Sequence, residues 1–399
     1  MHVLDWRNPL MKIAVLFPTC IAISLATISS AWADVRTLLP FYERAVAIDG
    51  ACAWPQLTRL PGGGIAAFLW PESNHGLTEG AVECWSSPDG GVTWLRTGVP
   101  VPYDPGTNRM NLASGLTAEG DLIAIVSGWD RVRAKVPPGQ PPAPTPPGPL
   151  RGKTRDPIPA ISRDGGRTWI RHPAIPPLEG TGGETLIPYG RILVLPDGKL
   201  GSLFYSTAVH LLVSADGGKT WQKRGRLTES FLEPRDRTHN ETDWIILDNG
   251  DFYAVARGYG DGSLTAYRSR DAGATWSAEG HMSGPNQHPA SLTRLPDGTL
   301  LLSYGIRNPG DHGVSVRAGK PDAHAWSDPI KLADFEGWRV APGQKRSTDS
   351  GYPSTVALDD GTLVTAYYSA GVPEHQRYHM GVVRWQLDPA LVRWPSGIR

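Results

Sequence analysis

Ser269-Arg-Asp-Ala-Gly-Ala-Thr-Trp276 is one of four copies of the pattern Ser-x-Asp-x-Gly-x-Thr-Trp. The other copies are Ser87–Trp94, Ser162–Trp169 and Ser214–Trp221. In such a pattern the aspartate accepts local backbone N–H bonds, the glycine adopts a positive φ, and the Thr-Trp pair restarts a strand. Each copy therefore predicts a hairpin turn and marks one structural repeat.

A second hairpin signal recurs in the chain. It is an apolar run, a glycine-containing turn such as Pro-Asp-Gly or Asp-Asn-Gly, and a second apolar run, which together are typical of paired strands. It occurs at Leu57–Phe68, Leu116–Ile123, Ile192–Leu203, Ile246–Phe252, Leu292–Ser303 and Val356–Tyr367. These occurrences predict six repeats.

Each repeat is interpreted as a four-stranded blade, and six blades that close in a ring make a β-propeller. The predicted fold is therefore all-β, a six-bladed propeller with no long helix. The predicted blades are 50–96, 108–171, 183–224, 239–279, 287–328 and 347–388. The last has no Asp motif, so a strand from residues 36–48 is expected to complete it and close the ring. The proline-rich segment 137–149 is expected to be an exposed insertion within the second blade.

The first 33 residues resemble a secretory signal peptide. An apolar run, Ile13–Ile28, precedes Ala31-Trp32-Ala33, and Met11 offers an alternative start. The expected mature chain is a single propeller, 34–399, secreted or periplasmic, with no integral membrane segment. With 39 basic and 39 acidic residues, the composition gives no reason to expect a nucleic-acid partner.

Two cysteines, Cys52 and Cys84, remain after the predicted cleavage. An oxidising compartment is compatible with one disulfide between them. Two unpaired buried thiols are an equal alternative, because a free cysteine packs as a small hydrophobic residue.

Four Asp motifs in a six-unit propeller resemble the sialidase (neuraminidase) superfamily of BNR-repeat proteins. The resemblance covers residues 36–388 and implies an oligosaccharide or glycoconjugate substrate, with no cofactor. Sialidases use a tyrosine nucleophile, because a neutral phenol is not repelled by the carboxylate beside the anomeric carbon. The high pKa of a phenol then requires a base in contact with it.

The resemblance implies a partial catalytic set. Tyr352 matches the nucleophile and Glu241 its base, so the Tyr352 hydroxyl is expected within about 2.6–3.2 Å of Glu241. Asp349 precedes the tyrosine in Asp-Ser-Gly-Tyr. The leaving-group acid is expected between Trp70 and Gly76, where Glu72 or His75 replaces the family's aspartate.

The arginines that bind the sugar carboxylate in sialidases are also only partly matched. Arg257 and Arg307 match two of them, and both are expected beside the catalytic pair. The first arginine is replaced at Ala53, and its supporting glutamate is absent from Ala366–Ser369. The loss of both partners indicates a rebuilt site, since loss of one would leave a buried charge at a cost of about 3–5 kcal/mol.

Further candidate binding residues begin inner strands or offer an aromatic face. His288 and Glu184 are expected to face the central funnel, and Trp54 or Trp129 could stack on a sugar ring. No metal-ligand spacing occurs in the sequence.

The predicted function is an exo-acting glycoside hydrolase that cleaves a terminal acidic sugar through Tyr352 and Glu241, similar to an exo-alpha-sialidase. One alternative is a polysaccharide lyase on a uronic-acid glycan, in which His75 or His288 acts with Tyr352 and Arg257. A non-catalytic glycan-binding propeller is the other.

Overall fold

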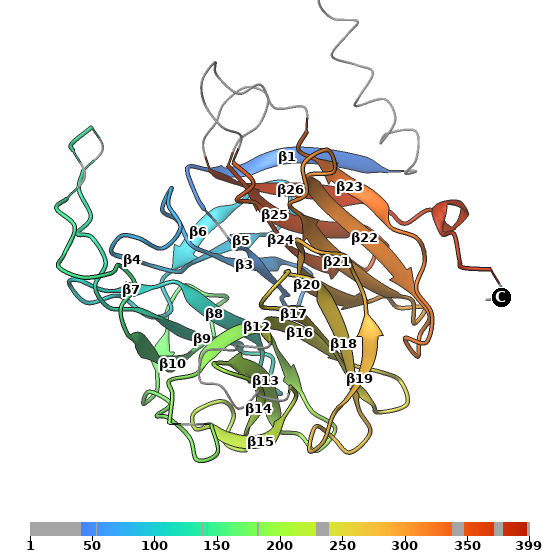
Figure 1. The fold of residues 1–399 in the computed structure, drawn as a ribbon, viewed down its shortest axis with the longest axis horizontal. Helices are drawn as coiled ribbons and strands as arrows, with labels where there is room; N and C mark the ends of the chain where they lie inside the picture. The colour runs from blue at the N-terminus through green and yellow to red at the C-terminus, as the bar shows by residue number, and fades with distance from the viewer. Residues whose placement is uncertain are drawn as a thin grey trace, which may run out of the picture.

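The computed structural model describes residues 41–396, except for 53, 138, 142, 182, 229–238, 337–346 and 371–377. The described residues form strands and one short 3-10 helix, η1 (Pro389–Leu391). The strands are arranged around a central axis as the blades of a β-propeller (Figure 1). The predicted signal peptide and residues 36–40 of the predicted closing strand lie outside the described residues.

The strands pair into six four-stranded antiparallel units, each running from the axis to the rim. The first unit is β2 (Gln56–Arg59), β3 (Ile65–Leu69), β5 (Glu83–Ser87) and β6 (Leu95–Gly98). The second is β8 (Asn111–Leu116), β9 (Leu122–Trp129), β10 (Thr154–Ser162) and β11 (Ile170–Arg171). The third is β12 (Ile187–Val194), β13 (Leu200–Tyr205), β14 (Val209–Ser214) and β15 (Gln222–Arg226).

The remaining units follow the same plan. The fourth is β16 (His239–Ile246), β17 (Phe252–Gly258), β18 (Leu264–Ser269) and β19 (Ser277–His281). The fifth is β20 (Gln287–Arg294), β21 (Leu300–Ile306), β22 (Gly313–Gly319) and β23 (Ile330–Asp334). The sixth is β24 (Gly351–Ala357), β25 (Leu363–Ser369), β26 (His379–Trp385) and β1 (Tyr42–Asp49). Two short strands, β4 (Gly80–Ala81) and β7 (Asn108–Arg109), form a separate parallel pair.

Two units also share backbone pairing at the axis. Strands β8 and β12 are parallel neighbours, which joins the second and third units into one eight-stranded sheet. Gly115 permits this approach, because a Cβ there would lie 2.1 Å from the Ile192 carbonyl oxygen. A side chain at this position would therefore separate the two inner strands.

The Asp motifs form the predicted turns between the third and outer strands of the first four units. In the fourth unit, Asp271 accepts hydrogen bonds from the Thr275 N–H at 2.9 Å and from the Thr275 hydroxyl at 2.6 Å. Gly273 has a φ of +88°, and its carbonyl accepts a bond from the Trp276 indole at 3.1 Å. The hydrogen bonds from Thr275 and Ser269 hold the pKa of Asp271 at about 2. The motif thus satisfies its own backbone groups without using the central funnel.

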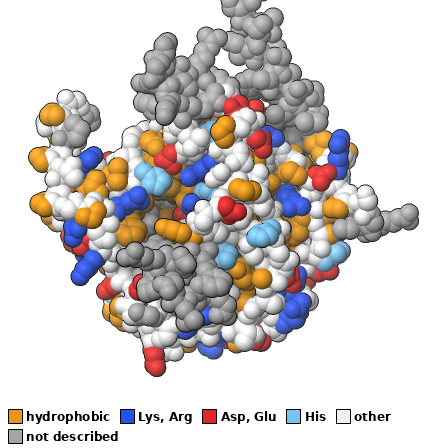
Figure 2. Space-filling model, in the orientation of Figure 1, with side chains coloured by type: hydrophobic (Ala, Val, Ile, Leu, Met, Phe, Trp, Pro, Cys, Tyr) orange, Lys and Arg blue, Asp and Glu red, His pale blue; other side chains and the backbone are white. Residues whose placement is uncertain are grey.

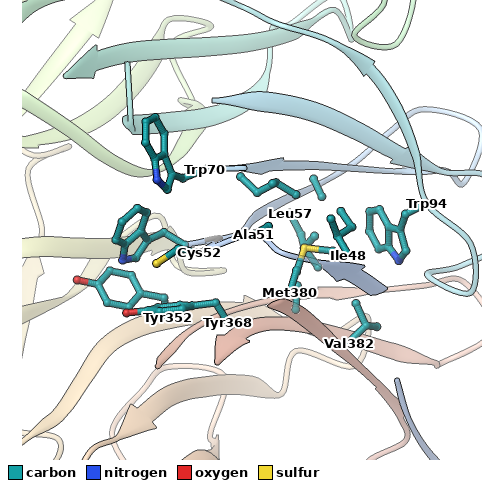
Figure 3. Close-up of a cluster of buried hydrophobic side chains, with 14 of the residues drawn as sticks. Ile48, Ala51, Cys52, Leu57, Trp70, Trp94, Tyr352, Tyr368, Met380 and Val382 are labelled. Atoms are coloured by element: carbon teal, nitrogen blue, oxygen red, sulfur yellow. The ribbon is translucent and has the colours of Figure 1, made fainter. Parts of the chain in front are cut away.

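The N-terminal strand closes the ring, as predicted. Strand β1 pairs antiparallel with β26, and Tyr42 lies opposite Trp385 (Figure 1). Ile48 packs with Trp94, Met380 and Val382 in a cluster that joins the first and sixth units (Figure 3). The last blade is therefore completed by residues more than 300 positions earlier in the chain.

Two local boundaries differ from the prediction or refine it. The outer strand of the fifth unit is β23, which lies beyond the predicted limit at 328, because Trp326 bridges back to Gly319 before that strand begins. The proline-rich segment lies between β9 and β10 and extends from the body of the propeller (Figure 1).

Cys52 and Cys84 are both buried, free thiols. Of the two alternatives left open by the sequence, the structure therefore has unpaired thiols. Among the described residues, no helix is long and apolar enough to cross a membrane.

Arg44 on β1 generates a prediction about ring closure. Its Nε donates to the Tyr367 hydroxyl at 2.6 Å, and its Nη1 donates to the Asp334 carbonyl at 3.0 Å. Because both contacts hold β1 against the fifth and sixth units, Arg44→Ala should lower the free energy of unfolding by about 1–3 kcal/mol. Denaturant unfolding followed by circular dichroism measures this change.

Arg163→Ala is the matched control, since the Arg163 side chain is 76% exposed and, among the described residues, forms an ion pair with Asp121 alone. Exposed ion pairs contribute about 0–1 kcal/mol, so this variant should stay close to wild type. Equal stabilities for the two variants would contradict the proposed contribution of Arg44 to closure.

Candidate active site

The starts of the inner strands meet at one end of the axis, and several carry a β-bulge there. The register shifts between Gly351 and Ser354 in β24, and between His239 and Thr242 in β16. A bulge turns a side chain away from the regular alternation of a strand. These two bulges contain Tyr352 and Glu241, which lie 111 residues apart in the chain.

Tyr352 and Glu241 are in direct contact. The Tyr352 hydroxyl donates to Glu241 Oε1 at 2.6 Å, within the expected range. Arg257 Nη1 lies 2.5 Å from Glu241 Oε2 and donates to the Tyr352 oxygen at 3.1 Å. The three groups form a closed triangle of phenol, carboxylate and guanidinium.

Burial determines the electrostatics of this triangle. Desolvation raises the pKa of Tyr352 well above its usual range, and the negative charge of Glu241 raises it further, while Arg257 opposes the rise. Burial alone would lower the pKa of Arg257, but Glu241 and Tyr352 raise it on balance. Tyr352 is therefore a neutral phenol in contact with a carboxylate.

A second network surrounds Asp349. The His75 Nδ1 lies 3.0 Å from Asp349 Oδ2, the Tyr378 hydroxyl donates to the same oxygen at 2.5 Å, and the Tyr368 hydroxyl donates to Oδ1. Burial would raise the pKa of Asp349, but the hydrogen bonds from His75, Tyr368 and Tyr378 lower it well below its usual value. Asp349 is thus held as a carboxylate that orients His75.

Arg307 links the two networks. It follows β21 directly, its Nε donates to the Ser350 carbonyl at 3.0 Å, and its Nη2 donates to the Tyr368 hydroxyl at 3.1 Å. Its guanidinium carbon lies 5.6 Å from the centre of the Tyr352 ring. Arg257 and Arg307 thus both contact Tyr352, as expected, but each is also bonded to protein groups.

A cavity of about 100 Å³ opens onto Tyr352 and Glu241. Its lining includes Tyr352, Glu241, His75 and Trp54, and it also includes Arg151 at the end of the proline-rich insertion. Arg257 and Arg307 are not part of the lining formed by the described residues. Arg151 is therefore the arginine that lines this space.

The insertion is fixed where it returns to the blade. Arg151 N donates to the Arg131 carbonyl at 3.2 Å, and Gly152 N donates to the Asp130 carbonyl at 3.0 Å. Arg151 itself has a φ of +54°, which is uncommon for a side-chain-bearing residue. Within the described part of the chain, no hydrogen bond or ion pair involves its guanidinium.

Two neutral donors also line the cavity. Asn111 Nδ2 and Trp129 Nε1 are buried and lack a hydrogen-bond partner among the described residues. Buried donors are normally satisfied by protein, water or ligand. Both groups are therefore unsatisfied donors in residues that line the cavity.

Of the other residues predicted from the sequence, some line the cavity and some do not. The Trp54 ring centre lies 4.6 Å from that of His75 and 6.3 Å from that of Tyr352, so the indole forms a wall of the site. Glu72 is bound by Lys135 Nζ at 2.6 Å instead of lining the cavity. Ala53 lies outside the described residues.

His288 and Glu184 are not brought to the cavity. His288 is 4% exposed, and burial together with Arg257 and Arg307 lowers its pKa to about 2. Glu184 is exposed and precedes β12, which begins only at Ile187. The expectation that both face the funnel beside the substrate therefore gains no support from the geometry.

Sequence reasoning missed Arg151, Tyr368 and Tyr378. Tyr368 stands in the segment Ala366–Ser369, where the family's glutamate was missing, so that absence was the available signal for a rebuilt network. Arg151 gave no comparable signal, because its position depends on how the insertion returns to β10.

On the face drawn in Figure 2, basic, acidic and histidine side chains are mixed over the described surface, which agrees with the zero net charge.

Solved structures show the same fold. A protein of unknown function from Dyadobacter fermentans has a TM-score of 0.68 at 22% identity, over 88% of this chain and 100% of that one. The NanB sialidase from Streptococcus pneumoniae has a TM-score of 0.63 at 13% identity, over 87% and 70% of the two chains. The Trypanosoma rangeli sialidase, solved in complex with sialic acid, has a TM-score of 0.61 at 15% identity, over 87% and 59%.

No curated protein matches the sequence. A family model described as a BNR repeat-like domain matches residues 150–365, more than half of the chain. This match shows that the chain belongs to the BNR repeat-like family, and the solved structures show that its propeller has the fold of sialidases.

Proposed function

We propose that the chain is an exo-acting glycoside hydrolase that removes a terminal acidic sugar with retention of anomeric configuration. The observation that supports this most directly is the 2.6 Å hydrogen bond from Tyr352 to Glu241. A phenol with a raised pKa attacks only if a base takes its proton, and Glu241 is in position to do so.

In this mechanism Tyr352 Oη forms a covalent bond to the anomeric carbon as the bond from that carbon to the leaving-group oxygen breaks, and the phenol proton moves to Glu241. Arg257 stabilises the phenolate character that develops on Tyr352, because its Nη1 already lies 3.1 Å from the phenol oxygen. Water then cleaves the glycosyl-enzyme bond and gives one proton to the leaving-group acid, while Glu241 returns its proton to the phenol oxygen. A tyrosine suits an acidic sugar, since it reaches the anomeric centre without negative charge.

The proposed leaving-group acid is His75. It lines the cavity, and Asp349 accepts a hydrogen bond from its Nδ1, which leaves the other ring nitrogen for the departing oxygen. Asp349 is then a positioning residue, as is the carboxylate in a Ser-His-Asp triad. This pair replaces the aspartate that sialidases use.

For substrate binding, we propose that Arg151 receives the sugar carboxylate. Arg151 lines the cavity, whereas Arg257 and Arg307 are bonded to Glu241 and Tyr368. A charge-assisted hydrogen bond contributes about 1.5–3 kcal/mol, enough to replace part of what the missing first arginine supplies in sialidases.

Tyr352→Phe tests the nucleophile. The change removes one hydroxyl, so turnover should fall by at least about a thousandfold while the circular dichroism spectrum stays that of wild type. The assay is release of the aglycone from aryl glycosides of nonulosonic and uronic acids, with neutral sugars alongside. Tyr253→Phe is the control, because Tyr253 is buried in the fourth unit, where its hydroxyl contacts the Met282 sulfur at 3.7 Å.

Undiminished turnover in Tyr352→Phe would contradict the hydrolase mechanism. A product with ultraviolet absorption from a new double bond, without a new reducing end, would indicate the lyase alternative. Glycan binding without either product would indicate a non-catalytic propeller.

Arg151→Ala tests carboxylate binding. The KM for an acidic glycoside should rise about ten- to hundredfold with a smaller change in kcat, because the lost contact is made before the chemical step. The KM for the corresponding methyl ester should change little. Arg163→Ala controls for a general loss of positive charge in the same blade, and an unchanged KM in Arg151→Ala would refute this role.

A further inference from the structure

Three potential metal ligands converge beside the catalytic pair from distant parts of the chain. Cys52 lies between β1 and β2, His75 lies between β3 and β4, and Asp349 precedes β24. One ligand atom from each residue lies within 4.8 Å of those of the other two. Figure 3 shows the Cys52 sulfur beside Tyr352 and Tyr368.

The backbone holds these ligands in place. Cys52 N donates to the Glu72 carbonyl at 3.0 Å, which ties the thiol to the segment that carries His75. In that segment the Trp70 indole donates to the Asn74 carbonyl at 2.8 Å, and Leu77 N donates to the Asn74 side chain at 2.8 Å. The cluster is therefore built from a fixed loop and a buried strand connection.

The donor set has the chemistry of a borderline-soft metal. A thiolate, an imidazole and a carboxylate are the three ligand types that Zn²⁺ takes in proteins, usually in a four-coordinate site. Tyr368 and Tyr378 donate to the Asp349 oxygens, as outer-shell groups do for a ligating carboxylate. The thiol is fully buried, whereas the His75 side chain is 36% exposed, so a cation can enter from the cavity side.

We propose that Cys52, His75 and Asp349 bind one transition-metal cation of the Zn²⁺ class, with the fourth position open to solvent or ligand. Cys52 binds as the thiolate, and its proton leaves to solvent. Arg307 Nη2, 3.7 Å from Asp349 Oδ1, opposes the cation, but the thiolate and the carboxylate together carry two negative charges. Metal binding and proton donation by His75 exclude each other, since coordination breaks the His75–Asp349 hydrogen bond.

Co²⁺ is a suitable probe, because it accepts the same ligands and gives visible bands and a thiolate-to-metal charge-transfer band. Titration of the purified, reduced protein should saturate at one Co²⁺ per chain, and Zn²⁺ should displace it. Cys52→Ser should lose the charge-transfer band and at least about tenfold in affinity. Cys84→Ser should keep both, since within the described residues no comparable cluster surrounds Cys84.

Wild-type protein without a charge-transfer band, or a Cys52→Ser variant that retains it, would overturn the proposal. If Cys52→Ser does not fold by circular dichroism, His75→Gln decides: Co²⁺ affinity should fall at least about tenfold, and an unchanged affinity would refute the site. The optical readout does not depend on glycosidase activity, so failure of the proposed hydrolysis and failure of metal binding are separate results.

Discussion

The candidate site of this propeller depends on the partly buried ion pair between Glu241 and Arg257. A lone carboxylate next to Tyr352 would be costly to keep charged in a desolvated site, and a lone guanidinium would be equally costly. Paired at 2.5 Å, the two charges compensate each other, and both contact the phenol oxygen. The proposed nucleophile, its proposed base and the neighbouring cation are therefore one electrostatic unit.

Most of the fold could be predicted from the sequence, because its repeats are local. The Asp motif is stabilised by hydrogen bonds within eight residues, as in Ser269–Trp276. Its structure can therefore be predicted from its own sequence. The closing role of the N-terminal strand followed from counting hairpins. The outer strand β23 was placed too early, since the fifth unit lacks an intact motif to mark its turn.

The site was only partly predictable, for a physical reason. Tyr352, Glu241, Arg257 and Arg307 were found through resemblance to sialidases, and the structure brings them together. The neighbours that distinguish this chain, Arg151, Tyr368 and Tyr378, meet them across blades, and no local pattern encodes such contacts. Cys52, His75 and Asp349 have no metal-ligand spacing in the sequence because they span almost 300 residues. Glu184 was predicted at the start of an inner strand, facing the funnel, but it is exposed in the structure.

The site also indicates how a family pattern can change without unbalanced charge. Sialidases have an arginine and its supporting glutamate at the positions of Ala53 and Ala366–Ser369, and this sequence lacks both residues. In that neighbourhood Tyr368 now bridges Asp349 and Arg307, so neither charge is isolated. The replacement is an uncharged hydroxyl between two ions, which keeps the local charge close to neutral.

Closure by β1 has a consequence for how the chain folds. Strand β1 is synthesised early, yet its partner β26 lies at residues 379–385. Strand β1 therefore cannot form its backbone hydrogen bonds until β26 has been synthesised. Such pairing gives a high contact order and slow folding, because loop-closure entropy is lost before the contact forms. Until then the unpaired edge of β1 can pair with strands from other chains, and a C-terminally truncated chain would leave β1 exposed in the same way. Aggregation during synthesis is therefore the characteristic hazard of this architecture.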